Sequence, residues 1–169
     1  QSSAASDVYK RQVMLARDIE LVEYTQGKFH ASRISTKKSV ELIRAAKKKG
    51  LNISADVAIH NLVLLDQDCA TFDRNYKVFP PLRTSEDIKA LIEGLKDGTI
   101  DAICSDHCPE DVEHKVLTFD HANFGIIGAQ TVLPLALELQ KELGLHTIID
   151  ALSHNPRKLL GMDCPTIEE

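Results

Sequence analysis

The stretch NISADVAIH, residues 52–60, contains the clearest strand pattern in the sequence. Apolar residues occupy every second position from Ile53 to Ile59, and the positions between them include Ser54 and Asp56. Successive side chains of a β-strand point to opposite faces of a sheet. The alternation therefore predicts a strand with one apolar face and one face that carries polar groups, and His60 follows at its end.

The segments before this strand predict a helix, a short strand and a second helix. A helical pattern covers residues 14–26, and a short strand pattern covers residues 28–34. Thr36 is a suitable N-cap for a helix over residues 37–49, which Gly50 terminates. A strand, a helix and a further strand in this order predict a parallel βαβ unit.

The segments after residue 60 continue the same alternation. They first predict a loop containing FPPLR (79–83), a helix from Thr84 or Ser85 to Gly98, and a strand over 99–105. A loop over 106–123 follows, and then a helix over 126–143 that is bent at Pro134. The chain is predicted to end with a short helix over 147–153 and a last helix that has Asn155 as N-cap and Pro156 at its first position. The chain is therefore predicted to be an α/β protein. Three parallel strands do not close a barrel, so we expect them to be part of a larger α/β domain.

Composition narrows the possible partners. The formal net charge of −5 argues against a nucleic-acid partner, because binding a phosphate backbone requires a basic face. No apolar run approaches the roughly 18 residues of a membrane span, and the first residues do not form a signal peptide. The four cysteines include no C-x-x-C pair, so we expect them to be reduced and the protein to be cytoplasmic.

The first twelve residues, QSSAASDVYKRQ, differ from the rest of the sequence. They lack an initial Met, and their small, polar composition does not continue into the next segment. We interpret residues 1–12 as a non-native or truncated tail and leave them out of the fold prediction. Residues 13–169 are then the domain portion of the chain.

Functional groups of parallel α/β folds lie at the carboxyl ends of the strands. Arg33, His60 and Asp106 each follow one of the three predicted strands. Asp106 could bind a metal and accept a proton from metal-bound water, or it could act as an N-cap or an ion-pair partner. Arg33 cannot lose its charge, so it could bind an anionic substrate or pair with a carboxylate such as Asp106.

Other polar residues near these strand ends have simpler interpretations. His60 is interpreted as a hydrogen-bonded histidine of the interior rather than a ligand. The loop residues His107, Cys108, His114 and His121 could be drawn as a zinc site, but their spacing fits no structural zinc pattern. Cys104 is expected to be a small core residue.

Three longer motifs carry a family resemblance. They are FHASRISTKKSVELIRAAKKKGLNISADVAIHNL (29–62), YKVFPPLRTSEDIKALIEGLKDGTIDAICSDHCPE (76–110) and FGIIGAQTVLPLALEL (124–139). Together they resemble the C-terminal half of the dihydroorotases, which are members of the amidohydrolase superfamily. The resemblance extends from about residue 14 to residue 162. It implies that this chain is the C-terminal part of a (β/α)8 TIM barrel.

The resemblance also implies a chemistry. Dihydroorotases are zinc enzymes of pyrimidine biosynthesis that interconvert N-carbamoyl-L-aspartate and L-dihydroorotate. In the family, the aspartate after the last strand binds metal and carries the proton, and Asp106 occupies that position. Asp106 is therefore the implied catalytic residue and the implied metal ligand.

Several positions depart from the family pattern. Arg33 stands in HASRIST, where the family pattern H-x-x-H-[IV]-S-T has a ligand histidine, and His30 matches the first histidine. Phe79 stands where the family has a substrate-contacting Asn, and Glu110 where it has a substrate-contacting His. The usual pair of histidines after the middle strand is reduced to His60 followed by an asparagine. Arg33, Phe79 and Glu110 are thus the substituted substrate-site positions.

Two functional hypotheses follow. In the first, the chain is a portion of a dihydroorotase-like protein that has lost metal or catalytic competence. Its role would then be structural, through contact with aspartate transcarbamoylase or with itself. In the second, it belongs to an active zinc dihydroorotase or related cyclic amidohydrolase acting on a small anionic cyclic amide. We expect the 169-residue chain alone to be inactive, because half of the ligand set lies outside it.

Overall fold

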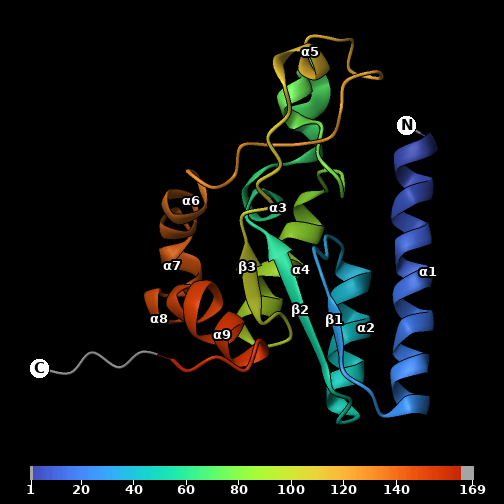
Figure 1. Cartoon of the computed structure of the whole chain (residues 1–169), viewed down its shortest axis with the longest axis vertical. Coiled ribbons are helices and arrows are strands. Elements are labelled where there is room, and N and C mark those ends of the chain that lie inside the picture. Colours follow the sequence, from blue (N-terminus) through green and yellow to red (C-terminus); the bar gives the residue numbers. More distant parts are fainter. Residues whose placement is uncertain (1, 165–169) are drawn as a thin grey trace, which may run out of the picture.

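A computed structural model describes residues 2–164 and contains a parallel sheet. Its strands are β1 (Phe29–Ala31), β2 (Ile53–Ala58) and β3 (Ala102–Cys104), in the spatial order β1-β2-β3. Each strand lies within a segment that the sequence predicts to be extended. The fold class is therefore confirmed as α/β, with β2 at the centre of the described sheet (Figure 1).

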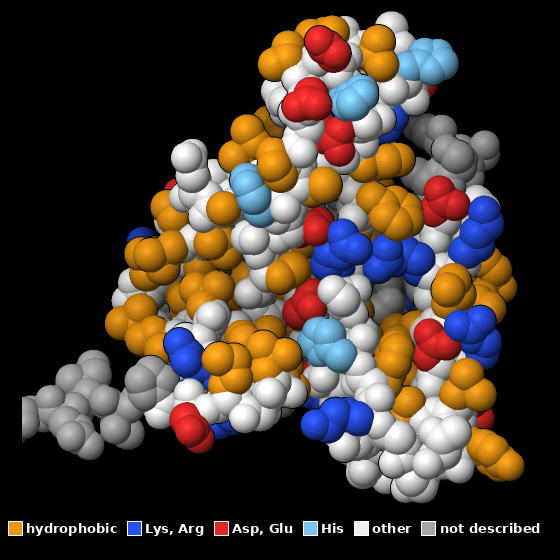
Figure 2. All heavy atoms as spheres, in the orientation of Figure 1, with side chains coloured by type: hydrophobic (Ala, Val, Ile, Leu, Met, Phe, Trp, Pro, Cys, Tyr) orange, Lys and Arg blue, Asp and Glu red, His pale blue; other side chains and the backbone are white. Residues whose placement is uncertain are grey.

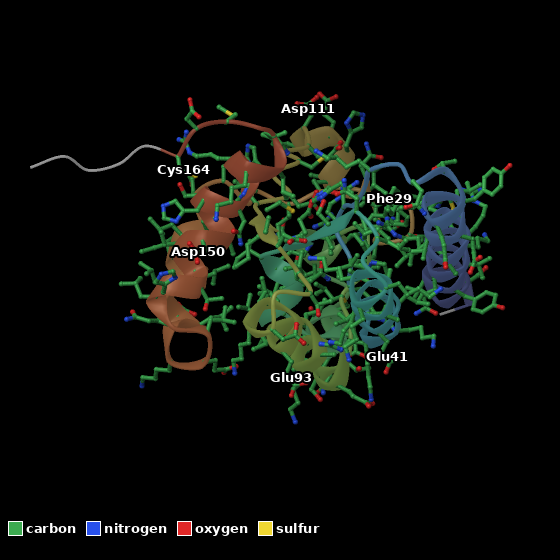
Figure 3. The ribbon with its side chains drawn as sticks, turned by 90° about the horizontal axis from the view of Figure 1, so that it is seen from below. Phe29, Glu41, Glu93, Asp111, Asp150 and Cys164 are labelled. Atoms are coloured by element: carbon green, nitrogen blue, oxygen red, sulfur yellow. The ribbon has the colours of Figure 1, made fainter. Side chains whose placement is uncertain are left out.

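Two helices connect consecutive strands. Helix α2 (Lys37–Lys48) joins β1 to β2, and helix α4 (Ser85–Lys96) lies between β2 and β3. The predicted caps are confirmed, because the Thr36 side chain accepts a hydrogen bond from the Ser39 amide and Thr84 accepts one from the Asp87 amide. Figure 3 shows α2, labelled at Glu41, and α4, labelled at Glu93, on the same side of the sheet.

The core lies between this sheet and its helices. In β2, Ala55 and Val57 are fully buried, and they share the core with Val40 and Ile43 of α2 and Leu91 of α4. The opposite face of β2 carries the polar side chains of Ser54 and Asp56, as the alternation predicts. Asp56 is nonetheless buried, so this face has to supply it with hydrogen-bond donors.

Helix α1 (Ser2–Thr25) is longer than the sequence predicts. The helical pattern was assigned from residue 14, but the helix also includes most of the segment interpreted as a tail. Leu15, Ile19 and Val22 join the core, which agrees with the predicted helix.

The C-terminal region is built from several short helical segments, whereas the sequence predicts one long helix followed by two short ones. They are α6 (Val132–Glu138), α7 (Gln140–Leu143), α8 (Leu145–Ile149), a π-helical turn (Asp150–His154) and α9 (Asn155–Leu159). The predicted helix over 126–143 was wrong for its first six residues. Gly128 lies against the end of β3 there, and a Cβ built on it would be 2.1 Å from the Ser105 carbonyl oxygen.

Two further details of this region correct the sequence prediction. Pro134 lies in the first turn of α6, where its missing N–H costs no helical hydrogen bond, so it does not bend a longer helix. Asn155 has helical backbone angles and is not an N-cap. Its side-chain amide instead donates a hydrogen bond to the Asp101 carbonyl oxygen, 2.9 Å away.

A small lobe extends beyond the carboxyl ends of the strands (Figure 1). After α3 (His60–Val63), it contains 3-10 turns at Asp66–Thr71 and Arg74–Tyr76, and later the short helix α5 (Val112–Lys115). The Lys115 ammonium fastens this lobe by donating to three backbone carbonyls, those of Arg74, Asn123 and Gly125, at 2.8–3.1 Å. Over the described residues, no helix combines the length and apolar character that crossing a membrane requires.

Candidate active site

The three strands place Arg33, His60 and Asp106 at one edge of the sheet. In the parallel pairing, Ala31 of β1 lies opposite Ala55 of β2, and Ala58 of β2 lies opposite Cys104 of β3. Each of the three polar residues follows one of these strands by two residues. On the side of the molecule shown in Figure 2, Lys and Arg side chains gather near the middle, beside carboxylates and a histidine.

Arg33 and Asp106 form an ion pair across the site. The Arg33 Nη1 donates to Asp106 Oδ1 at 2.9 Å, which is one of the two alternatives that the sequence leaves open for Arg33. The Asp106 side chain is 14% exposed and the Arg33 side chain 40% exposed. Both residues have a positive φ, +54° for Arg33 and +45° for Asp106, in the left-handed region that non-glycine residues seldom adopt.

Asp56 organises the neighbouring backbone. Its Oδ1 accepts hydrogen bonds from the Arg33 amide at 2.8 Å and from the Cys104 thiol at 3.3 Å. Its Oδ2 lies 2.8 Å from His30 Nε2, and the other ring nitrogen of His30 lies 2.7 Å from Ser54 Oγ. The Asp56 carboxylate therefore links all three strands just below the ion pair.

The functional importance of Asp56 was not predicted from the sequence. One signal was available, because a carboxylate in the middle of an otherwise apolar strand has to be paired with donors or a charge when it is buried. His30, which matches the first histidine of the family pattern, is one of those donors. Cys104 is another, and burial together with the charge of Asp56 raises the pKa of its thiol well above the usual value.

His60 is buried without a hydrogen-bond partner. Its side chain is 2% exposed, and neither ring nitrogen has a partner among the described residues. Its Nε2 lies 3.9 Å from Asp106 Oδ2, which is too far for a hydrogen bond. Burial lowers the pKa of the imidazole, an effect that Asp106 opposes and Arg33 reinforces. The described residues therefore do not supply the hydrogen bond that the interpretation of His60 expects.

Asn61, like His60, has buried side-chain polar atoms without a hydrogen-bond partner among the described residues. Its side-chain oxygen and nitrogen are both buried and have no partner within the described residues. Unpaired buried polar atoms are uncommon in folded proteins and indicate a group that another part of the molecule, a ligand or water satisfies. Two adjacent residues of this kind therefore lie at this edge of the sheet, near the ion pair.

The remaining predicted site residues lie farther out. Phe79 lines a cleft of about 370 Å³ together with Arg33, and its ring packs edge-to-face on Phe124 with the centroids 5.6 Å apart. The Glu110 carboxylate accepts a hydrogen bond from Asn123 at 2.9 Å and lies 3.6 Å from His114 Nδ1. Phe79 is thus brought to the cleft beside Arg33, whereas the contacts of Glu110 are with its own loop.

The donor set for a metal is incomplete in the part of the chain that the structure describes. No group of three or more His, Cys, Asp or Glu side chains is arranged there to hold a metal ion. Asp106 and His60 supply two suitable donors, but the end of β1 supplies the Arg33 guanidinium, which is not a metal ligand. The described residues alone therefore do not fit the zinc centre that the resemblance implies.

Sequence comparison identifies relatives over most of the chain. No protein-family model matches it. It is 49% identical over 154 residues to a dihydroorotase of Thermoanaerobacter sp. (strain X514), and the match covers 89% of this chain and 36% of the relative. It is 45% identical over 160 residues to a dihydroorotase of Acetivibrio thermocellus, covering 93% of this chain and 38% of that protein. The chain thus spans just over a third of the length of these relatives.

Solved structures agree with the sequence comparison. The L-hydantoinase (dihydropyrimidinase) from Arthrobacter aurescens matches with a TM-score of 0.83 and 27% identity, over 89% of this chain and 35% of that structure. The inactive dihydroorotase-like domain of the CAD-like multifunctional protein of Chaetomium thermophilum matches with a TM-score of 0.70 and 27% identity, over 89% and 42% respectively. The chain is therefore a relative of the dihydroorotases with the fold of the amidohydrolase barrels, as its motifs indicated.

Proposed function

We propose that this chain is part of a dihydroorotase-family protein whose site has lost metal-dependent catalysis and whose role is structural. The observation that carries the proposal is the ion pair of Arg33 with Asp106 at 2.9 Å. Asp106 is the chemical group that the family motif retains, and here a permanent cation already neutralises it. A carboxylate whose charge is already paired in this way is a poorer metal ligand than a free one.

The substituted substrate positions support the same proposal. Phe79 has no hydrogen-bonding group on its side chain, and Glu110 adds a negative charge where an anionic substrate would need a donor. The Glu110 carboxylate is also engaged by Asn123. The relative from Chaetomium thermophilum is described as inactive, so loss of activity is compatible with retention of this fold.

The exposed apolar surface supports a structural role. Hydrophobic side chains gather over α6 and α7 in Figure 2. Leu133, Leu137, Leu145 and Ile149 of the C-terminal helices are each more than two-fifths exposed. Exposed apolar patches of this kind are typical of surfaces that pack against other protein surfaces, which here can be those of the rest of a larger α/β domain or of a partner. We propose aspartate transcarbamoylase or a second copy of the protein as the partner.

One observation favours a second candidate, an active zinc dihydroorotase or related cyclic amidohydrolase. The buried ring nitrogens of His60 have no partner among the residues that the structure describes, and its Nε2 lies 3.9 Å from Asp106 Oδ2. The remaining donors would then come from the rest of a longer protein. Asp106 would accept the proton, and Arg33 would bind a carboxylate of a small anionic cyclic amide.

A turnover assay separates the two candidates. The longer protein that contains this chain is purified with zinc present throughout, and hydrolysis of dihydroorotate is followed together with the reverse cyclisation of N-carbamoyl-L-aspartate. The proposal predicts no turnover above that of the Asp106→Asn variant. Turnover that the Asp106→Asn substitution abolishes would establish the second candidate instead. Sedimentation with and without aspartate transcarbamoylase tests the structural role.

A further inference from the structure

The charge of Asp106 needs a partner at this position. Its carboxylate is largely buried, and transfer of an unpaired carboxylate out of water is costly. The Arg33 guanidinium donates a hydrogen bond to it at 2.9 Å, whereas the His60 imidazole, 3.9 Å away, lies beyond hydrogen-bonding distance. Arg33 therefore supplies the positive charge that keeps Asp106 in this position.

The position of Arg33 is fixed by its backbone. Asp56 binds two consecutive amides, because its side chain accepts from the Arg33 N–H at 2.8 Å and its main-chain oxygen accepts from the Ile34 N–H at 3.0 Å. This clamp holds Arg33 at φ +54°, a conformation that arginine seldom adopts without support. The backbone of Arg33 is thus held in place by Asp56, and from this position the guanidinium reaches Asp106.

The other groups at this edge are those that a divalent cation would use. Carboxylate and imidazole are common ligands of zinc and cobalt, and both Asp106 and His60 have donor atoms directed at this site. A third donor at the end of β1 would complete the set, but that position holds Arg33. A divalent cation bound to Asp106 and His60 would therefore lie close to a fixed positive charge.

We infer that Arg33 is a built-in cation of this site, positioned by Asp56 so that it neutralises Asp106 and excludes a divalent metal from the donors Asp106 and His60. The inference rests on the proposed loss of metal-dependent catalysis, and it names the residue that closes the site. It makes Asp56 a positioning residue, since Asp56 acts on the site through the backbone of Arg33.

Binding of Co²⁺ to the full chain tests this inference, with the visible absorption of the bound ion as the readout. Arg33→His removes the cation and adds a donor, and we expect it to bind Co²⁺ at least tenfold more tightly than the unsubstituted chain. Arg44→His is the matched control, because Arg44 also pairs with an aspartate, Asp97, but on the exposed surface of α2. It should leave Co²⁺ binding unchanged.

Two further variants keep the test decisive if Arg33→His folds poorly. Arg33→Lys retains the charge and should exclude Co²⁺ as the unsubstituted chain does, whereas Arg33→Met removes the charge and should bind it more tightly. Circular dichroism reports whether each variant is folded. Binding of Co²⁺ by the unsubstituted chain as tight as that of Arg33→His or Arg33→Met, with loss of that binding in Asp106→Asn, would overturn the inference. Because the readout is metal binding, this outcome is distinct from failure of the turnover prediction.

Discussion

Replacement of Asp56 should show how strongly the site depends on one carboxylate. Asp56→Ala removes the acceptor of three hydrogen bonds, from the Arg33 amide, His30 Nε2 and the Cys104 thiol. The first two are charge-assisted bonds worth about 1.5 kcal/mol each, and the thiol bond is weaker, so the free energy of unfolding should fall by roughly 3–4 kcal/mol. That is a large part of the 5–15 kcal/mol that is typical of a folded domain.

Asp56→Asn is the matched control for this prediction, because its amide can satisfy the same neighbours. The amide oxygen can accept from the Arg33 N–H and the Cys104 thiol, while the amide nitrogen faces His30 Nε2. His30 then has to carry its proton on Nδ1 and donate it to Ser54 Oγ, which is already 2.7 Å away. Asp56→Asn loses only the contribution of the negative charge to these hydrogen bonds, so the free energy of unfolding should fall by about 1 kcal/mol.

Urea denaturation followed by circular dichroism measures both variants at one pH, with the midpoint and slope fitted separately. A loss of less than 1 kcal/mol for Asp56→Ala would refute the role of this carboxylate as the link between the three strands. Equal losses for the two variants would refute the proposed change of His30 tautomer.

Three smaller predictions concern the surroundings of the site. Gly128→Ala should destabilise the protein by roughly 2–3 kcal/mol in urea denaturation, because a Cβ there would meet the Ser105 carbonyl oxygen at 2.1 Å; an unchanged midpoint would contradict this contact. Lys115→Met should accelerate limited proteolysis of the α5 lobe while changing the global midpoint little, since it removes three hydrogen bonds to backbone carbonyls at the periphery; unchanged cleavage would contradict that role. Burial raises the pKa of the Cys104 thiol, so at pH 8 it should be alkylated on the order of 100-fold more slowly than the exposed Cys108. Mass spectrometry of iodoacetamide adducts measures both rates, and equal rates would argue against burial of the Cys104 thiol.

The sequence predicted the parts of this structure that depend on local patterns. All three strands and the caps at Thr36 and Thr84 follow from apolar periodicity and from the chemistry of a hydroxyl side chain at a helix start. The sequence also indicated the pairing of Arg33 with Asp106 as one of two possible roles for Arg33, because parallel strands bring their carboxyl ends together.

The missed features depend on contacts between distant segments. The hydrogen bonds of Asp56 require the register of β1 against β2 and of β2 against β3, which no local pattern specifies. The lack of partners for His60 within residues 2–164 depends on what surrounds the side chain in three dimensions. The predicted helix from residue 126 begins only at Val132, since Gly128 has to pass close to the end of β3, and helical periodicity gives no sign of that contact.

The central claim is that Arg33 serves as the charge partner of Asp106, and a double-mutant cycle measures it directly. Arg33→Met, Asp106→Asn and the double variant are compared by urea denaturation, with chelator and then with zinc present. Because Asp106 is largely buried and Arg33 is partly exposed, the coupling free energy measured with chelator should be about 1–2 kcal/mol, between the values of exposed and buried pairs, and zinc should not stabilise the unsubstituted chain. A coupling near zero, or a zinc-dependent stabilisation of the unsubstituted chain that Asp106→Asn removes, would contradict the claim.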